Sequence, residues 1–385
     1  MQIFKILFRN AFRHKLRTFL TILSVTIAVL AFCLLRTVIS AWYAGAEASS
    51  ASRLVTRNAI SLIFSLPLSY HEKIRQIEGV RAVSYANWFG GVYIEEKNFF
   101  ANLAVEPKAY LQLYPEFVLT PGQQEAFLRD RKGALVGAKL ASRFGWKIGD
   151  IITLKGTIYP GNWEFVVRAI YHGKDERTDE SQFLFHWDYL NETLKKTAPP
   201  RADQIGIYMV GVTNPSQSAE VTARIDATFK NSLAETLTET EKAFQLSFVS
   251  MSEAIILAIK VVSFVVIIII LAVVANTMAM TMRERMGEYA VFKTLGFKGW
   301  RIAGLIVGES LVITMLGAGL GIALTFPVAA VFKKILGAYF PIFNVAPDTV
   351  GLAIVCSVAV ALLAAIVPTW RAVTMRIADG LRRIG

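Results

Sequence analysis

The sequence predicts an integral membrane protein with four transmembrane helices, one followed by three, and a large α+β domain outside the cytoplasm between the first and second spans. Three observations support this fold class: four long uncharged apolar stretches, an uneven distribution of positive charge, and a central segment that mixes strand and helix patterns. Of the 385 residues, 54% are hydrophobic and only 18% are charged. Soluble domains usually carry about 25% charged residues.

Four stretches are long enough to cross a bilayer, which takes about 20 consecutive apolar residues. They contain no Asp, Glu, Lys or Arg and occupy Thr18–Leu35, Val261–Met282, Ser310–Phe332 and Thr349–Trp370. Ala44-Gly45-Ala46 resembles a signal-peptide cleavage site, but the preceding apolar region is longer than that of a typical signal peptide. We therefore expect the first span to be an uncleaved anchor.

The net charge of +12 lies beside the apolar stretches. Residues 47–250 hold 23 basic and 23 acidic side chains, so the central segment is neutral, whereas residues 1–17, 283–301 and 371–385 each carry an excess of Lys and Arg. Because positively charged loops stay in the cytoplasm, these three segments are predicted to be cytoplasmic. The charge follows from membrane topology and does not indicate a nucleic-acid partner.

These observations divide the chain into consecutive segments. We expect a cytoplasmic amphipathic helix (1–17), transmembrane helix 1 (18–42), an extracytoplasmic domain (43–243), a stalk with transmembrane helix 2 (244–282), a cytoplasmic loop (283–301), transmembrane helix 3 (302–332), a short outer loop (333–348), transmembrane helix 4 (349–370) and a cytoplasmic tail (371–385). Within the outer domain we expect a split α/β part (43–104 and 201–243) and a β-rich insert (105–200).

Local patterns in the outer domain predict its elements. Runs rich in β-branched and aromatic residues predict strands at 59–64, 82–88, 99–105, 151–154, 165–171, 207–212 and 233–239. Helical patterns occupy 70–76, 137–144 and 215–229. Asn214 is a candidate N-cap for the last helix, with Pro215 at its first position.

An apolar stripe precedes the second span. Phe244, Phe248, Met251 and Ile255 follow the 4-3-4 spacing of a coiled coil. The stripe predicts a rigid stalk that packs against a second copy of the chain or a close relative. An ordinary amphipathic helix packed on the outer domain fits the same spacing.

Two further features of the spans allow alternative interpretations. Gly304–Gly308 and Gly317–Gly321 are small-xxx-small pairs that let helices approach closely, either within one chain or between two protomers. Glu309 is the one acidic residue inside a span, and intramembrane acids are often functional. We expect Glu309 to pair with a cation on the cytoplasmic side or with a neighbouring helix, in preference to a role in proton transfer.

The loop between the second and third spans combines charged and aromatic side chains. Aromatic residues in a short cytoplasmic loop favour a docking helix for a partner protein, with Gly296 as its end. The candidate coupling residues are Arg283, Arg285, Glu288, Tyr289, Phe292, Lys293 and Gly296.

No catalytic, cofactor or metal motif is present in the sequence. It has no Gly-x-x-x-x-Gly-Lys-Ser/Thr loop for nucleotide phosphates, and its four histidines have no metal-ligand spacing. Its two cysteines, Cys33 and Cys356, both fall within predicted spans, so the outer domain has no disulfide framework. We expect the chain not to be an enzyme by itself.

Several motifs together resemble the FtsX-like, MacB-type permeases of ABC transporters. The run from Arg283-Glu284-Arg285 through Glu288 and Ala290 to Lys293-Thr294-Leu295-Gly296 is similar to their cytoplasmic signature, and Glu309 matches the acid that follows it. Pro368-Thr369-Trp370-Arg371-Ala372 resembles the motif at the end of their last span, although the tail lacks the usual Pro and has Asp379-Gly380 instead. The segment from Gly133 to Leu154 is similar to part of their outer domain.

The resemblance implies a permease in the bacterial cytoplasmic membrane that works with a separate ATPase subunit and a second permease copy or a paralogue. It implies that ATP hydrolysis by the partner drives movement of the outer domain and thereby export or extraction of a substrate, with a periplasmic adaptor as a further candidate partner. A lipoprotein-releasing permease and a membrane-anchored sensor or regulator of a cell-wall enzyme remain alternatives. The substrate is left open.

Overall fold

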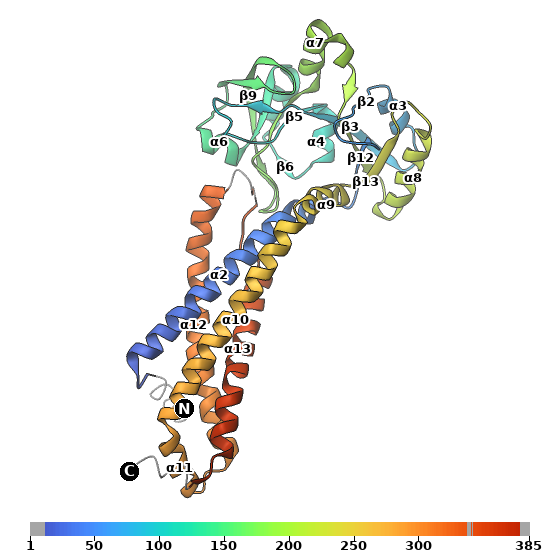
Figure 1. Cartoon of the computed structure of the whole chain (residues 1–385). Helices are drawn as coiled ribbons and strands as arrows, with labels where there is room; N and C mark the ends of the chain where they lie inside the picture. The colour runs from blue at the N-terminus through green and yellow to red at the C-terminus, as the bar shows by residue number, and fades with distance from the viewer. Residues whose placement is uncertain (1–11, 337–339, 341, 378–385) are drawn as a thin grey trace. The chain divides into compact units, whose positions relative to one another are not determined.

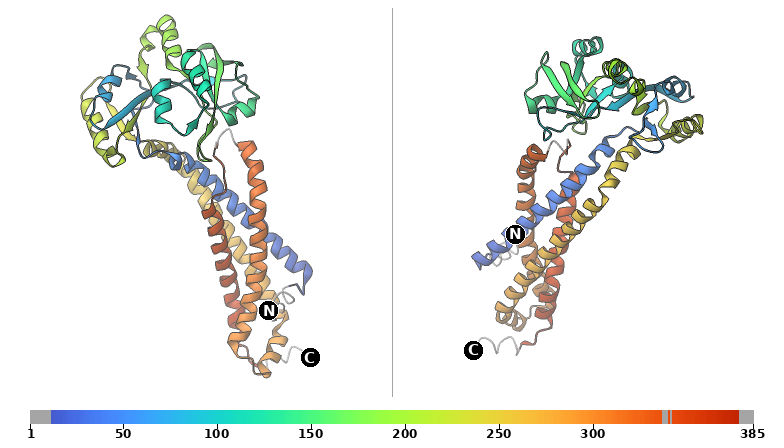
Figure 2. Two further views of the ribbon diagram at one scale, coloured as in Figure 1. Left: turned by 180° about the vertical axis from the view of Figure 1, so that it is seen from behind. Right: turned by 45° about the horizontal axis from the view of Figure 1, so that its top comes forward.

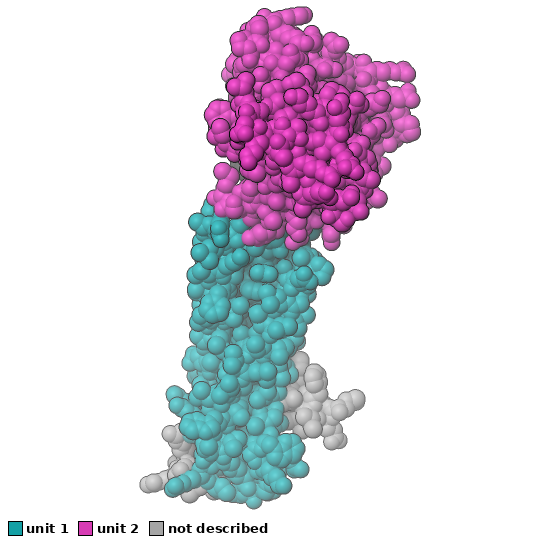
Figure 3. Space-filling model, turned by 90° about the vertical axis from the view of Figure 1, so that its right-hand side faces the viewer, with its two compact units in different colours: residues 1–41, 252–335, 343–385 teal, residues 42–251, 336–342 magenta. Residues whose placement is uncertain are grey.

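The computed structural model describes residues 12–336, 340 and 342–377. The predicted amphipathic helix at 1–17 and the end of the tail lie largely outside these residues. The chain divides into two compact units, coloured separately in Figure 3. Unit 1 comprises Met1–Ala41, Ser252–Ile335 and Phe343–Gly385, and unit 2 comprises Trp42–Met251 and Leu336–Ile342.

Unit 1 is helical, and its long helices lie along one another (Figure 1). Among the described residues, four helices are long and apolar enough to cross a membrane, in the predicted order of one plus three. The helices of this unit are α2 (Lys15–Ala48), α10 (Glu253–Glu284), the short α11 (Met286–Thr294), α12 (Gly299–Leu336) and α13 (Pro347–Thr374). Helix α2 continues past Ala41 into unit 2.

Helices α2 and α12 pack closely because α12 has no side chains at two contact positions. A Cβ added at Gly317 would lie 2.7 Å from the Cβ of Val25, and one at Gly321 would lie 2.7 Å from the carbonyl oxygen of Thr26. The Thr26 hydroxyl also donates to the carbonyl of Gly317 at 3.1 Å. The Gly317–Gly321 pair therefore allows close packing within one chain, one of its two interpretations. Added atoms at Gly304 would meet nothing within 4 Å.

Unit 2 contains a mixed sheet with helices on both faces (Figure 2). The described strands form an eleven-stranded sheet in the order β13-β1-β12-β3-β5-β10-β7-β9-β8-β4, with β6 paired to β9, and a separate β2–β11 pair. The elements are β1 (Arg53–Asn58), β2 (Leu66–Pro67), α3 (Tyr70–Arg75), β3 (Val80–Trp88), β4 (Gly91–Val92), β5 (Asn102–Val105), α4 (Pro107–Leu113), β6 (Phe117–Val118), α5 (Pro121–Arg129), β7 (Gly133–Gly137), α6 (Ala138–Phe144), β8 (Ile151–Gly156), β9 (Gly161–Gly173), β10 (Phe183–His186), α7 (Trp187–Thr197), β11 (Gln204–Ile205), β12 (Ile207–Val212), α8 (Ser218–Thr228), β13 (Thr236–Thr240) and α9 (Glu241–Met251).

Side chains of the sheet alternate between two apolar clusters, one on each face, as the strand period of two requires. In β10, Phe183 and Phe185 belong to the cluster covered by α7, whereas Leu184 belongs to the cluster covered by α4. Strands of the predicted insert, such as β7 and β9, belong to the same sheet as strands of the predicted split part. The α+β domain between the first and second long helices is thus built on one large sheet with two covered faces, and the β2–β11 pair is separate from it.

One predicted strand is wrong. The first strand is Arg53–Asn58, and residues 59–65 form a loop in which Ile60 and Ile63 are 81% and 89% exposed. The side chain of Asn58 accepts a hydrogen bond from the backbone N–H of Ile60 at 3.0 Å. An asparagine that bonds two residues ahead turns the backbone, which ends the strand before the apolar run.

The predicted stalk is also not one continuous helix. Helix α9 ends at Met251, and α10 begins at Glu253 after Ser252 leaves the helical conformation with φ −103° and ψ 11°. The hydroxyls of Ser247 and Ser250 each donate to the carbonyl three residues earlier at 2.7 Å. Serine side chains that hydrogen-bond to nearby backbone compete with regular helical geometry. The three serines of this segment therefore explain why the helix breaks here.

Candidate functional site

The candidate coupling segment folds as the short helix α11 in unit 1. Arg285, with φ −101° and ψ 9°, ends α10 and precedes α11, so the chain turns between the two helices at this residue. At the other end, Gly296 has φ +84°, as predicted. The backbone N–H of Gly296 donates to Lys293, and that of Phe297 donates to Phe292, both at 3.0 Å. The rings of Phe292 and Phe297 lie 5.3 Å apart, which completes a Schellman motif with its apolar contact.

A buried ion pair joins Arg285, the residue just before α11, to Glu309 of α12. Arg285 is 5% exposed and Glu309 is 3% exposed, and Nη1 of Arg285 donates to Oε2 of Glu309 at 2.8 Å. Nε of Arg285 donates to Oε2 of Glu288 at 3.0 Å. The structure therefore confirms the prediction that Glu309 pairs with a cation or a neighbouring helix.

Two more contacts connect α11 to other helices of the unit. Glu288 accepts a hydrogen bond from Arg13, just before α2. Beside this contact, but outside α11, Arg17 of α2 donates to both carboxylate oxygens of Glu284 in α10 at 2.7 and 2.8 Å. The amine of Lys293 donates to the last carbonyls of α13, at 2.8 Å for Val373 and 2.7 Å for Met375. Helix α11 is thus bound to α12, to α13 and to the segment that begins α2.

The burial of Tyr289 differs from the prediction that its ring fills a groove on a partner. Tyr289 is 1% exposed and packs in the apolar core of unit 1 with residues such as Met282 and Ile302. Burial raises the pKa of its phenol to about 12. The ring is therefore neutral beside Arg285, whose guanidinium carbon lies 5.4 Å from the ring centroid. Phe292 is partly buried against the same core.

Other side chains of the segment are exposed. Arg283 is exposed, as are Leu295 at 69%, Trp300 at 69% and Val291 at 40%. Together with Phe297, these exposed apolar side chains lie on α11 and on the residues that follow it, and we call this set the α11 surface: Val291, Leu295, Phe297 and Trp300. Leu295 and Trp300 are not among the predicted coupling residues, since periodicity alone does not say which apolar side chains of a short helix face inward.

The predicted stalk residues are mostly exposed. Phe248, Met251 and Ile255 are 44%, 85% and 54% exposed, whereas Phe244 is half-buried and its ring lies 5.1 Å from that of Phe248. Within the described ranges no group of three or more metal-ligating side chains is close enough to hold a metal ion. The described side chains around α11 meet through ion pairs, hydrogen bonds and apolar contacts.

The fold and this site define a multi-pass membrane protein with a large α/β unit between its first and second long helices. The model of the MacB-like periplasmic core domain matches residues 18–228, more than half of the chain, and the model of the FtsX-like permease C-terminal region matches residues 260–377. The chain belongs to the MacB/FtsX type of ABC transporter permeases.

Two solved structures are similar to part of the chain. The extracellular domain of the noncanonical ABC-type transporter YknZ from Gram-positive bacteria is 13% identical, with a TM-score of 0.35, and the match covers 49% of this chain and 100% of that one. A domain of a permease protein from Porphyromonas gingivalis is 15% identical, with a TM-score of 0.33, and the match covers 49% of this chain and 90% of that one. No curated protein matches the chain.

Proposed function

We propose that this chain is the permease subunit that couples ATP hydrolysis by a separate ATPase subunit to movement of its outer domain, and thereby drives export or extraction of a substrate. The observation that carries the proposal is the attachment of α11 to three other parts of unit 1. Arg285 binds α12 through Glu309, Glu288 binds Arg13 before α2, and Lys293 binds the end of α13. A force applied to α11 would therefore act on these helices together.

The α11 surface is the proposed contact with the ATPase. Buried apolar and aromatic anchors supply most of the energy at protein interfaces. Leu295 and Trp300 are the most exposed side chains of this surface, and Tyr289 is inside the unit. We assign docking to the exposed set and an internal structural role to Tyr289, Arg285 and Lys293.

Replacing Leu295 with alanine should weaken recruitment of the ATPase, because an interface anchor commonly contributes about 2 kcal/mol, or roughly thirtyfold in affinity. The measurement is co-purification of the ATPase at matched permease levels. The control is Leu233→Ala, since Leu233 is at least as exposed but lies in unit 2. Equal loss of recruitment in both variants, or in neither, would contradict the docking assignment.

We also propose that both termini and α11 lie in the cytoplasm and that unit 2 lies outside it, because the excess positive charge flanks these segments. A cysteine at the exposed Lys174 should react with an impermeant maleimide in intact spheroplasts. A cysteine at the exposed Lys298 should react only after the membrane is permeabilised. The reverse pattern of labelling would show that the orientation is wrong.

A second permease copy or a paralogue is the proposed partner of the stalk. Met251 is 85% exposed, so a cysteine there should form a disulfide with its counterpart in the partner chain under mild oxidation. Lys242 is a matched control, because it is exposed on α9 about two and a half turns earlier and therefore on the opposite face. Crosslinks of equal yield at both positions would indicate random collision and not a stalk interface.

A further inference from the structure

One cation in the helical unit 1 has no counter-ion. Arg36 of α2 directly follows the uncharged stretch Thr18–Leu35. Its side chain is half-buried, and its Nε is buried without a hydrogen bond. Within residues 12–336, 340 and 342–377, the guanidinium of Arg36 has no hydrogen bond and no ion pair. An ionisable side chain at a membrane span is costly, and it commonly marks a site where something binds.

The level of Arg36 in the membrane follows from the charges at the other end of α2. Arg17, which pairs with Glu284, precedes the uncharged stretch, and Arg36 follows it. At a rise of 1.5 Å per residue the two arginines are about 28 Å apart along the helix, close to the roughly 30 Å thickness of the hydrocarbon core of a bilayer. With Arg17 at one boundary of the core, Arg36 therefore lies at the other, where the lipid headgroups begin.

Helix α10 places a second cation at this level. It lies beside α2 and runs antiparallel to it, since it reaches its contacts with α2 in the reverse order (Figure 1). The hydroxyls of Thr21 and Thr277 meet at 3.1 Å, and counted from this contact Arg36 and Lys260 are about equally far along their helices. Lys260 is exposed and has no ion pair in the part of the chain described. On α13, Cys356 is close enough to Arg36 for an electrostatic interaction.

The described helices carry no acid at this level. Glu309, the acidic residue inside a span, already has its own cation. The first acids beyond Arg36 are Glu47 on α2, Glu253 on α10 and Asp348 on α13. They lie about 12–17 Å along their helices from the level of Arg36. A second copy of this chain in the same orientation would present the same acids at the same levels, so it would not supply the counter-ion either.

The position and the charge select the class of ligand. The phosphate groups of bilayer lipids lie just outside the hydrocarbon core, at the level of Arg36. A guanidinium presents its N–H donors in a planar fork that matches phosphate oxygens, and basic sites between membrane helices bind anionic headgroups. An anionic lipid would balance the positive charge of Arg36 and Lys260, whereas a zwitterionic lipid brings a cation of its own.

We propose that Arg36 binds the phosphate of an anionic phospholipid at the boundary where α2 leaves the membrane. Because Nε is buried, the donors are the two Nη atoms. Lys260 adds positive charge at the same level and is assigned no contact with the phosphate. The inference concerns unit 1 alone. It holds for either orientation of the chain in the membrane and does not depend on coupling to an ATPase.

The test is a titration of the delipidated full chain in detergent with dioleoyl phosphatidylglycerol, followed by native mass spectrometry. Arg36→Met should weaken the first binding step about tenfold, because charge-assisted hydrogen bonds are lost. Arg36→Lys, which keeps the charge without the planar fork, should lose less affinity. Arg36→Met removes no bond within the described chain, so without lipid it should melt at the temperature of the unmodified chain.

Lys260→Met is the matched control, since Lys260 is an exposed cation at the same level and its loss should change affinity by less than about twofold. Dioleoyl phosphatidylcholine should bind the unmodified chain more weakly than phosphatidylglycerol does. Excess inorganic phosphate should not displace the lipid. Equal weakening by Arg36→Met and Lys260→Met would indicate general attraction to a charged boundary and overturn the proposal. Unchanged affinity in Arg36→Met, equal affinity for the two lipids, or displacement by inorganic phosphate would each overturn it as well.

Discussion

Replacing Arg285 with methionine should destabilise unit 1 by about 3–5 kcal/mol, because it would leave a buried carboxylate without its cation. Glu309 is 3% exposed, and its hydrogen bond from Arg285 is 2.8 Å long. The same substitution removes the hydrogen bond to Glu288. The measurement is the denaturation midpoint of the detergent-solubilised chain, followed through the helical signal.

The double variant Arg285→Met with Glu309→Leu distinguishes an unpaired charge from lost packing. Replacing both members of a buried pair with apolar residues of similar volume is often neutral, so the double variant should recover most of the lost stability. Arg283→Met is the matched control, since Arg283 is exposed two positions away and should tolerate the change. A double variant as unstable as Arg285→Met would refute the electrostatic explanation.

The features that the sequence predicted correctly are local in the chain. The order of one plus three long helices was predictable because each span is a contiguous uncharged stretch of the sequence. The left-handed conformation of Gly296 was predictable because glycine often takes it just past the end of a helix. Glu309 was expected to pair with a cation, because an unpaired charge inside an apolar transmembrane helix is unfavourable in free energy. The identity of that cation, Arg285, required the structure, because several basic residues lie in the same loop.

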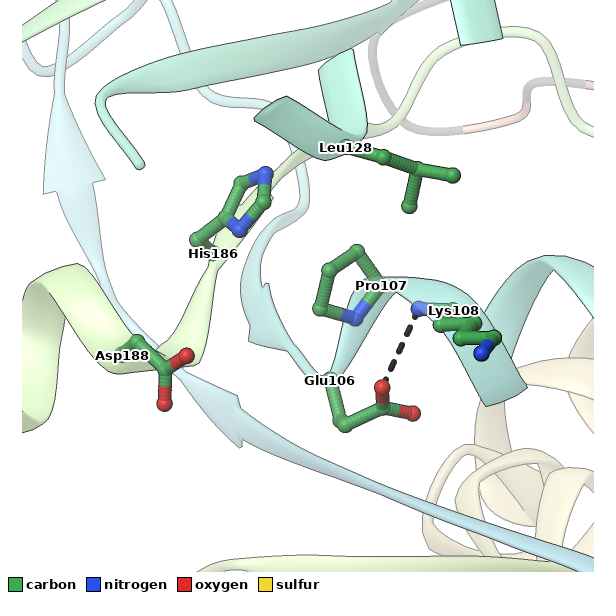
Figure 4. Close-up of a pocket in the computed structure, with 6 residues that line it drawn as sticks. All are labelled: Glu106, Pro107, Lys108, Leu128, His186 and Asp188. Carbon is green, nitrogen blue, oxygen red and sulfur yellow. Dashed lines mark hydrogen bonds between the residues drawn. The ribbon is translucent and has the colours of Figure 1, made fainter. Parts of the chain in front are cut away.

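The features that the sequence could not supply depend on residues far apart in the chain. Tyrosine is a common anchor residue at protein interfaces, so the sequence suggested that Tyr289 contacts a partner. Its packing in one buried cluster with Met282 and Ile302 shows that it lies in the core of unit 1. A pocket of unit 2 is lined by both Glu106 and His186, which the parallel pairing of β5 with β10 brings to the same edge of the sheet (Figure 4). A short strand such as β10 carries too little pattern to predict either its presence or its neighbour.

A second buried ionic cluster lies in unit 2, where the chain enters and leaves the sheet domain. Arg53, at the start of β1, is 5% exposed, and its Nε donates to Glu241 at 2.8 Å while Nη2 donates to Glu116 at 2.6 Å. Its guanidinium also donates to the carbonyl of Leu113 at 2.8 Å and lies 4.2 Å from the ring centroid of Tyr114. Burial by itself would lower the pKa of Arg53, but the two carboxylates raise it above its usual value, so the side chain stays charged.

Replacing Arg53 with methionine should therefore destabilise unit 2 by about 3–5 kcal/mol. Glu241 is 7% exposed, at the first position of α9, and it also accepts hydrogen bonds from Ser50 and Tyr114. Without Arg53 its charge would remain buried and held by neutral donors alone. Hydrogen exchange of the full chain measures this effect locally, and we expect lost protection in β1 and in β12 and β13, the two strands that pair with β1.

Arg57→Met provides the matched control on the same strand. Arg57 pairs with Glu239 of β13 at 3.1 Å, but both side chains are about one-fifth exposed, so solvent screens the pair and its loss should cost no more than about 1 kcal/mol. Adding Glu241→Gln to Arg53→Met removes the buried charge and should restore part of the protection. If Arg53→Met and Arg57→Met reduce protection equally, burial does not determine the strength of these pairs and the cluster is not an anchor of the α/β unit.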